Sequence, residues 1–302
     1  MMKSISLLSL FLFLFIGMGF AQNAKKENST YLNQSPPGST PQIFAPGIVS
    51  VKDRYEFGSV FTKDGKDFYF AIEEEKRPRI ECIKYENDKW SEPAKVLASD
   101  KYGYNDPFLS PDEQRLFFIS DQAMDGKGDK KDIDIWYVER QKDGWSKPLN
   151  AGKEINSAHN EYYISFTKGG TMYYSSNKQA ENVKSNKYDI YTSPFSKSAF
   201  GASTRLGSAI NSEHYEADVF VSPNEDYLIY CAERPDGVGR GDLWISFKDS
   251  KGQWGKAKNM GNAINTQGYE FCPFVTADGK YLFFSRDGDI FWVDAKVISG
   301  LK

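Results

Sequence analysis

Hydrophobic and polar residues follow one short pattern that occurs five times along the chain. In each copy a short apolar strand ends in a polar turn and an aromatic strand follows, as in residues 108–109, 110–112 and 116–118. The turns are anchored at equivalent positions, which are Asp64, Asp112, Gly169, Asn224 and Asp278. Successive anchors are 48 to 57 residues apart. A repeat of about this length, built only from strands, is typical of a propeller blade.

Two further strand signals recur within each repeat. A third strand is predicted at residues 133–138, 188–191, 241–244 and 288–292, where Asp precedes an apolar or aromatic run. An outer strand is predicted at residues 90–93, 145–148, 200–202 and 254–257, each of which begins with an aromatic residue. Four strands per repeat predict an all-β fold, a five-bladed β-propeller of four-stranded antiparallel blades.

The last repeat is one strand short, because only residues 295–302 follow its third strand. The missing strand is predicted near the start of the chain, at Ile43 to Ser50, which precedes Tyr55-Glu56 as residues 254–264 precede Tyr269-Glu270. We therefore expect this N-terminal strand to pair with residues 290–293 and to close the ring. Closure removes exposed sheet edges. Residues 41–302 would then form a single β-propeller domain.

The first residues resemble a secretory signal peptide. Lys3 precedes an apolar stretch from Ile5 to Phe20, and Gly19-Phe20-Ala21 gives the small-residue end that cleavage requires. A membrane anchor is the alternative, but the stretch is shorter than the ~20 apolar residues that span a bilayer. We expect residues 1–21 to be the signal peptide and residues 22–40 to be a polar tether. The mature chain would have no membrane span and would be exported, either to the periplasm or as a secreted protein.

Composition limits the classes of partner and cofactor. With 302 residues, 40% of them hydrophobic and 15% aromatic, the chain can form one large core. A formal net charge of −3 provides no basic surface, so no nucleic-acid partner is expected. Cys82, Cys231 and Cys272 each lie inside a strand-like run. We expect them to be small buried hydrophobic residues rather than disulfide partners.

Candidate binding residues lie just before each inner strand. Four of the five repeats carry a carboxylate eight residues before the turn anchor, namely Glu56, Glu161, Glu216 and Glu270. The second repeat carries Tyr104 at this position. We expect the carboxylates to surround one opening on the axial face, with Tyr55, Tyr215, Tyr269, His159 and His214 at its rim and Arg234, Arg240 and Arg286 on the neighbouring loops. Such a face suits a sugar, a peptide or a cation. The alternative is that a repeated residue only caps strand ends in every blade.

No cofactor and no resident metal are expected from the motifs. Four carboxylates in one ring would repel one another, so either a bound cation or neighbouring Arg side chains would have to compensate for them. Two His residues without evident further ligands are weak evidence for zinc. The Gly-rich segments 126–128 and 237–241 do not open a helix after a strand and therefore lack the context of a phosphate loop. There is no Gly-x-Ser-x-Gly motif.

These repeats resemble the exported bacterial WD-like or TolB-like propeller repeats. The resemblance covers roughly residues 32–298 and is carried by Ser110-Pro111-Asp112, Ser222-Pro223-Asn224, Ala277-Asp278-Gly279, Asp134-Ile135-Trp136 and Gly288-Asp289-Ile290-Phe291. The third repeat departs from the pattern at Lys168-Gly169. The resemblance implies a protein-binding or envelope-associated module. We expect a module that binds an envelope protein, a peptide or a glycan without catalysis. The alternative is a glycan-active enzyme, either a glycoside hydrolase or a polysaccharide lyase, with its site at the axial face.

Overall fold

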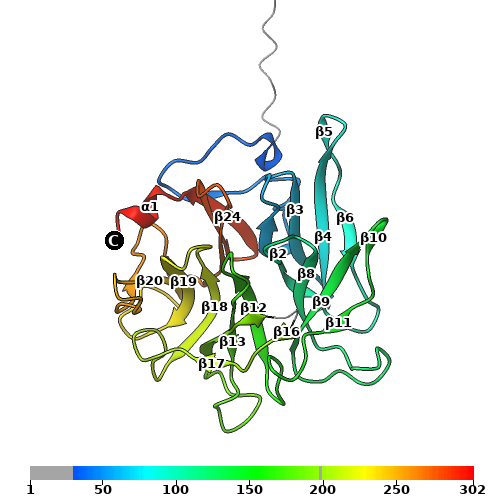
Figure 1. Ribbon diagram of the computed structural model, residues 1–302. Coiled ribbons are helices and arrows are strands. Elements are labelled where there is room, and N and C mark those ends of the chain that lie inside the picture. The colour runs from blue at the N-terminus through cyan, green and yellow to red at the C-terminus, as the bar shows by residue number, and fades with distance from the viewer. Residues whose placement is uncertain (1–29, 76, 197–198) are drawn as a thin grey trace, which may run out of the picture.

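Five antiparallel sheets surround a central axis, as blades of a propeller do (Figure 1). The computed structural model describes residues 30–75, 77–196 and 199–302. The predicted signal peptide, residues 1–21, lies outside the described residues. The all-β, five-bladed architecture predicted from the repeat is confirmed.

Each blade has four strands, which run in chain order from the axis outward except in blade 5, whose outermost strand is the first strand of the chain. Blade 1 consists of β2 (Tyr55–Phe61), β3 (Asp67–Glu74), β4 (Arg77–Glu86) and β6 (Ala94–Leu97), and blade 2 of β7 (Asn105–Leu109), β8 (Arg115–Ser120), β9 (Asp134–Gln141) and β11 (Leu149–Asn150). Blade 3 contains β12 (Glu161–Phe166), β13 (Met172–Ser176), β14 (Asp189–Ser193) and β17 (Thr204–Arg205). Blade 4 contains β18 (Tyr215–Val221), β19 (Tyr227–Glu233), β20 (Asp242–Phe247) and β21 (Lys258–Asn259). Blade 5 contains β22 (Glu270–Val275), β23 (Tyr281–Arg286), β24 (Asp289–Asp294) and β1 (Gln42–Ile43).

The ring is closed by the N-terminal strand, as the missing outer strand predicts. β1 pairs antiparallel with β24, so that Gln42 is opposite Trp292 and Ile43 is opposite Phe291. The backbone N–H of Phe44 extends this ladder by donating to the carbonyl of Ile290 at 2.8 Å. The paired segment is shorter than the expected Ile43 to Ser50, because the chain turns away after Phe44. The last blade therefore combines strands from both ends of the domain.

The predicted outer strands begin too early in the chain. Trp90 and Trp145 belong instead to the short strands β5 (Lys89–Trp90) and β10 (Gly144–Trp145), which extend the hairpin of the third strand. Phe200 lies in another such hairpin, formed by β15 (Phe195–Ser196) and β16 (Ala199–Phe200). The true outer strands follow a few residues later. In these three blades the aromatic residue that the sequence pattern places at the start of the outer strand belongs instead to the hairpin.

The residues of the turn after each inner strand determine how that turn is held. In blade 2 the Ser110 hydroxyl donates to the Asp112 carboxylate at 2.6 Å and accepts the N–H of Arg115 at 2.9 Å, which fixes the hairpin. The third repeat, which lacks the acidic residue, closes a tighter turn in which the Thr167 N–H donates to the Thr171 carbonyl at 3.0 Å. Gly170 in this turn has φ +89°, a conformation that glycine adopts without strain.

Part of the segment expected to be a tether packs on the domain. η1 (Tyr31–Asn33) places Tyr31 against Phe61 and Tyr281, with ring centroids 5.1 and 4.9 Å apart. Tyr31 and Leu32 are buried. Farther along, the N–H of Asp294 donates to the carbonyl of Gly38 at 3.0 Å. Residues 30–40 therefore lie along blades 1 and 5.

Aromatic side chains fill the spaces between blades, and a short helix, α1 (Lys296–Ser299), ends the fold. Cys82, Cys231 and Cys272 are free and buried, as predicted. Within the part of the chain that the structure describes, no helix is both long and apolar enough to cross a bilayer.

Candidate functional site

The four glutamates predicted to face an opening are fully buried, each with an exposed fraction of 0%. In blades 3, 4 and 5 the glutamate is bound by a Ser or Thr four residues earlier in the chain. The Ser157 N–H donates to Glu161 Oε2 at 3.1 Å, and its hydroxyl donates to Oε1 at 2.7 Å. Ser212 with Glu216 and Thr266 with Glu270 repeat this arrangement. We call this arrangement the glutamate clamp. It fixes the connection that enters each of these inner strands.

A further side chain binds each glutamate, although the Oε2 atom of Glu56 has no hydrogen-bond partner among the described residues. Arg234 lies 3.0 Å from Glu216, Arg286 lies 2.6 Å from Glu270, and Arg54 forms an ion pair with Glu56. Glu161 has no arginine and instead accepts the Ser176 hydroxyl at 2.8 Å. Burial therefore raises the pKa of Glu161 to about 7.

The sequence left two ways to compensate the charge of the glutamates, a bound cation or neighbouring arginines. In blades 1, 4 and 5 the glutamate has an arginine neighbour. We infer that the glutamates stabilise the fold, because each already has intramolecular partners.

The other predicted site residues lie in different environments. Tyr55 is 43% exposed. Tyr215 and Tyr269 are half-buried, and the pKa of each is raised by burial. Tyr104 is buried and donates to Gln122 at 2.7 Å, in the place where other blades have the glutamate.

The predicted cations also separate into two groups. Arg234 and Arg286 belong to the glutamate clamps, whereas Arg240 is exposed and its charge lowers the pKa of nearby Tyr55. His159 and His214 lie in equivalent clamp turns, where their backbone N–H groups donate to Ser157 and Ser212.

A β-bulge in every inner strand places one residue at the axis. Six residues before each turn anchor, the backbone has φ between 44° and 51°, at Gly58, Asp106, Tyr163, Asp218 and Cys272. The strand registers shift at these points in all five blades. Equivalent positions in a closed repeat lie at equivalent height around the axis. The sequence pattern does not predict these five residues, the axial cluster, because a bulge depends on strand pairing.

Contacts across the axis hold this cluster together. The Asp106 carboxylate lies 3.5 Å from the Cys272 sulfur, and the Tyr163 hydroxyl donates to the carbonyl of Pro273 at 2.8 Å. A Cβ atom at Gly58 would lie 2.8 Å from Asp106 Oδ1, so glycine is required beside this carboxylate. Blade 2 and blade 3 are in this way linked to blade 5 through the centre of the ring.

Two carboxylates of the axial cluster have no cationic partner. Asp106 and Asp218 are 6% and 7% exposed, and no described Lys, Arg or His forms an ion pair with either one. Burial raises the pKa of Asp106 to about 7. Burial and then the charge of Asp106 raise the pKa of Asp218 to about 8. Isolated buried carboxylates are costly to the fold, which distinguishes this pair from the clamp glutamates.

Aromatic rings form an arc near these carboxylates. We call the following residues the aromatic arc: Tyr162, Tyr188, Tyr215, Tyr269, Phe271, Phe57 and Tyr55. Tyr162 stacks on Tyr188 at 4.9 Å, and Tyr188 meets Tyr215 at 5.6 Å. Tyr215 and Tyr269 lie close enough for each to influence the pKa of the other. Phe271 then lies 5.5 Å from Tyr269 and 6.3 Å from Phe57, whose ring is 5.7 Å from Tyr55.

The arc and the carboxylates are electrostatically coupled. After burial, the charge of Asp218 is the next cause of the raised pKa of Tyr215, and it also acts on Tyr188 and Tyr269. Tyr162 is influenced by both carboxylates. The two groups therefore form one site, the axial mouth.

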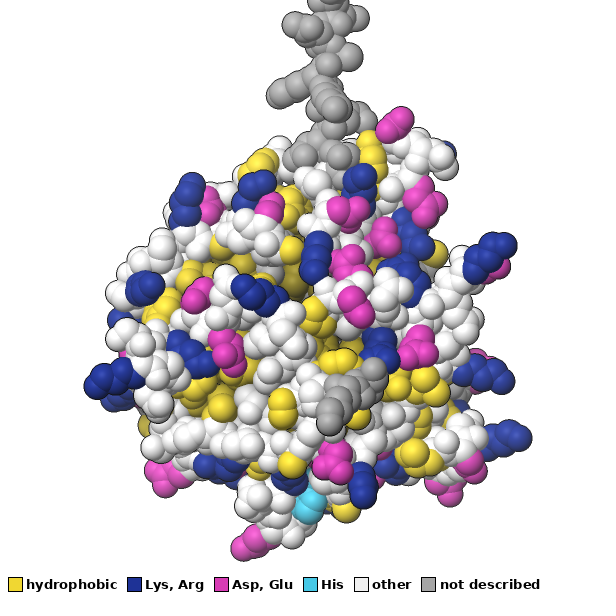
Figure 2. Space-filling model, viewed as in Figure 1, with side chains coloured by type: hydrophobic (Ala, Val, Ile, Leu, Met, Phe, Trp, Pro, Cys, Tyr) yellow, Lys and Arg dark blue, Asp and Glu magenta, His cyan; other side chains and the backbone are white. Residues whose placement is uncertain are grey.

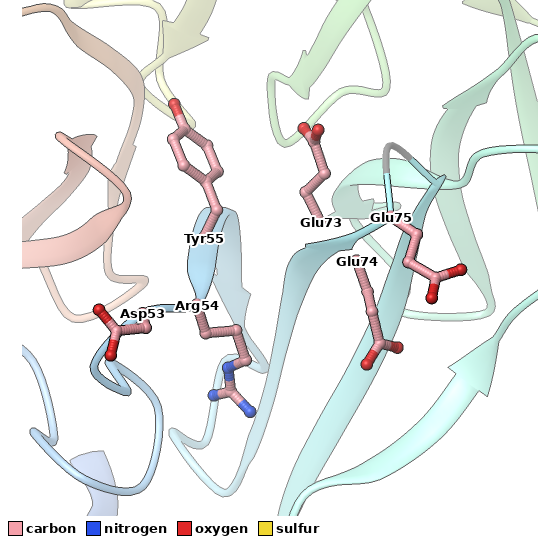
Figure 3. A pocket seen from close by; sticks show the side chains of 6 residues that line it. All are labelled: Asp53, Arg54, Tyr55, Glu73, Glu74 and Glu75. Atoms are coloured by element: carbon pink, nitrogen blue, oxygen red, sulfur yellow. The ribbon is translucent and has the colours of Figure 1, made fainter.

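A cavity of about 560 Å³ adjoins the mouth at blade 1 and is lined by Asp53, Arg54, Tyr55, Glu73, Glu74 and Glu75. Figure 3 shows Tyr55 and Glu73 extending to the same side from β2 and β3, whereas Arg54 and Glu74 extend to the other side. The charge of Glu73 raises the pKa of Tyr55, so this carboxylate is near the arc. The wall of the mouth is acidic at this point.

Toward the turns, the axis is filled by apolar side chains. The ring of Phe274 lies 6.0 Å from both Phe108 and Phe220. A small cavity of about 110 Å³ at this end is lined mainly by such residues. In Figure 2, hydrophobic side chains reach the surface around the middle of the face, and charged side chains of both signs spread over its periphery. The polar chemistry of the axis is therefore confined to the end that carries the axial mouth.

Comparison with protein-family models and with curated protein sequences finds no match. Solved structures do share the fold. Endo-arabinase from Bacteroides thetaiotaomicron is 15% identical with a TM-score of 0.51, over 79% of this chain and 90% of that one. A protein of unknown function from Dyadobacter fermentans is 12% identical with a TM-score of 0.50, over 85% and 83%.

TolB from Acinetobacter baumannii is another structural neighbour, 16% identical with a TM-score of 0.49. The match covers 79% of this chain but only 54% of the TolB chain, or about half of its length. At these identities, the likenesses to the endo-arabinase and to the Dyadobacter protein concern the fold alone and leave the function to be argued from the site.

Proposed function

We propose that the protein is an exported binding module that recognises an envelope protein, a peptide or a glycan at its axial mouth, without catalysis. The observation that carries the proposal is the pair of buried carboxylates, Asp106 and Asp218, which lack a cationic partner among the described residues. A repeat fold does not need them, since the equivalent positions are Gly, Tyr and Cys in the other blades. Groups that are costly to the fold and lie beside a partly exposed arc of aromatic rings are best explained by a ligand.

The aromatic arc supports the same proposal. Tyr55 is the most exposed ring of the arc, and Tyr162, Tyr215, Tyr269 and Phe271 are half-buried. Aromatic side chains that keep one face open are frequent in binding sites, because they bury a large area with little loss of conformational freedom. We therefore place the ligand over the arc, with its polar groups toward the carboxylates.

Screening purified protein against peptide and glycan panels, with binding and product release both measured, tests this function. We expect binding without turnover, and we expect Tyr215→Ala to weaken it by about tenfold or more while the fold is retained. A ligand whose affinity is unchanged by Tyr215→Ala and by Tyr269→Ala would place the site elsewhere and would contradict the proposal.

A glycan-active enzyme is the second candidate, and one observation favours it. Asp106 and Asp218 interact with each other, and the pKa values of the two carboxyl groups are raised to about 7 and about 8. A carboxylic acid that stays protonated near neutral pH can act as a general acid. Release of shortened glycans that is abolished by Asp218→Asn would identify an enzyme, whereas binding without product supports the module.

Export is proposed from residues 1–21 and tested separately. The charged start, apolar middle and small-residue end predict cleavage after Ala21. Fractionation of cells followed by N-terminal sequencing should find a mature chain that starts at or near Gln22, outside the cytoplasm. A cytoplasmic protein that retains Met1 would contradict this part of the proposal.

A further inference from the structure

At two places in the described structure an arginine lies over an aromatic ring and pairs with a fully buried glutamate. Arg234 lies over the Trp244 ring at 4.8 Å and forms an ion pair with Glu216 at 3.0 Å. Arg286 lies over the Phe291 ring at 4.6 Å and pairs with Glu270 at 2.6 Å. In both cases a ring face and a buried carboxylate hold one guanidinium group.

The axial mouth has the same two components without the cation. Asp106 and Asp218 are more than nine-tenths buried, and no described residue supplies an ion pair to them. Tyr162, Tyr188 and Tyr215 lie in contact with one another and within the electrostatic range of Asp218. Rings and carboxylates in this arrangement attract a positive charge from both directions.

We propose that the axial mouth recognises an organic cation, namely the guanidinium or ammonium group of a basic side chain in a peptide or protein. This inference rests on the binding function proposed above and specifies its ligand. The cation sits against the tyrosines of the aromatic arc and is neutralised by Asp106 and Asp218. The exposed carboxylate of Glu73 beside the mouth favours the approach of a basic segment.

A metal ion fits this site less well than an organic cation. No group of three or more His, Cys, Asp or Glu side chains in the described ranges is arranged to hold a metal ion. Calcium takes six to eight oxygen ligands, and two carboxylates beside aromatic rings do not provide such a shell. A neutral sugar could use the rings but would supply no countercharge to favour the ionised form of the carboxyl groups, as a cation does.

Blocked tripeptides with a central Arg, Lys, Gln or Glu serve as probes, because the central side chain then carries the only charge. Binding to the full mature protein is measured by calorimetry or by NMR titration at low and high salt. We expect the Arg and Lys peptides to bind about tenfold or more tightly than the Gln peptide, with weaker binding at high salt. The Glu peptide should not bind.

Three variants locate the site. Asp218→Asn should weaken binding of the Arg peptide about tenfold, whereas Asp143→Asn, at an exposed turn on the outer edge, should leave it unchanged. Arg240→Gln should strengthen binding about twofold, since a nearby positive charge is removed. Thermal melting of each variant confirms that it is folded.

The outcomes separate this inference from the function on which it rests. If a neutral glycan binds, requires Tyr215, and has the same affinity in Asp218→Asn, the cation inference is wrong and the binding function stands. If no peptide and no glycan binds at the mouth, both are overturned. Equal binding of the Arg and Gln peptides also overturns the cation inference.

Discussion

At the scale of single residues, two sets of buried carboxylates have opposite environments. Glu216 and Glu270 each have an arginine, a hydroxyl and a backbone N–H as partners. Asp106 and Asp218 have at most a thiol or one backbone N–H. The first set costs the fold little because each charge is compensated, whereas the second set is destabilising when ionised. From this difference we infer that the glutamates stabilise the fold and that the aspartates serve to bind a ligand.

Asp218→Asn should make stability less dependent on pH. The pKa of Asp218 is raised to about 8 in the folded protein, against about 3.9 in an unfolded chain. Between these values the folded state binds more protons, so stability is highest below about pH 4 for this group and is lost as pH rises through 8. The Asn variant should therefore melt at a higher temperature than the wild type at pH 8.5, with a smaller difference at pH 5.5.

Two other groups contribute in the same direction, since the pKa values of Asp106 and Glu161 are raised to about 7. The variant should consequently retain part of the pH dependence. Asp218 is surrounded by tyrosines, Asp106 and the backbone of Cys272, so no described cation reverses the sign. Asp143→Asn is the control, and identical melting profiles for wild type and Asp218→Asn would contradict the argument.

Glu216→Gln should destabilise the protein more than Glu161→Gln. Glutamine preserves the shape of both clamps. At position 216, however, it removes the countercharge of Arg234, whose side chain is only 12% exposed. Breaking such a pair costs about 3–5 kcal/mol. At position 161 the partners are hydroxyls and a backbone N–H, and the cost is about 1–2 kcal/mol. Denaturant unfolding of both variants measures the difference, and equal losses would mean that the arginine has no special role.

At the scale of elements, an asparagine beside each of three glutamate clamps fastens neighbouring segments. Asn156, Asn211 and Asn265 each accept an N–H from a third strand and donate to the carbonyl of the same strand residue. The side-chain amide thus acts like one more residue of a strand. In the closing blade, Ser50 accepts the N–H of Ile290 at 3.3 Å and takes the equivalent place. The connection between blades is therefore as ordered as the blades themselves.

Asn211→Ala tests this connection. The variant loses the bond from the Ile190 N–H at 2.7 Å and the two bonds donated by the amide at 2.9 Å, all of them buried or half-buried. At about 0.5–1.5 kcal/mol each, the loss should reach about 2–4 kcal/mol of unfolding free energy. Asn182→Ala, at an exposed loop, should be nearly neutral. A loss below about 0.5 kcal/mol at position 211 would show that solvent replaces these bonds.

The elements also show how far the sequence could lead. The turns and the alternation of apolar residues predict the inner strands correctly, because both are local properties. The outer strands were misplaced, since Trp90 and Trp145 pack on hairpins that extend the third strands. The bulge at Asp218 could not be predicted either, because a register shift is defined only when β18 meets β19. The sequence does contain one usable signal, because the position of Asp218 in the repeat is occupied by a different kind of residue in most of the other blades.

At the scale of the whole molecule, the axial mouth depends on closure of the ring. Blades 1 to 5 each contribute one residue to the axial cluster, and bonds from Asp106 and Tyr163 end on blade 5. Blade 5 is itself completed by β1 from the other end of the domain. Opening the closure should therefore loosen both the sheet and the site, which makes stability and binding measurable together.

Phe44→Ala should open the closure. Phe44 is fully buried and contacts Phe61 and Phe68 of blade 1 together with Phe283 and Trp292 of blade 5. Removing a buried phenyl ring costs about 3–5 kcal/mol, so the melting temperature should fall by several degrees or more. Ile43→Ala is the matched control, because its side chain is 40% exposed and its backbone pairing with Phe291 is retained.

If the ring closes through this segment, the Phe44 variant should also lose affinity for ligands of the axial mouth, although no atom of Phe44 belongs to that site. The Ile43 variant should keep both its melting temperature and its affinity. The two readouts have a common cause, since displacement of β1 from β24 frees the edge of the blade that carries Cys272 and Pro273. Equal stability of the two variants would mean that pairing with β24 alone holds the ring, and that the aromatic contacts of Phe44 add little.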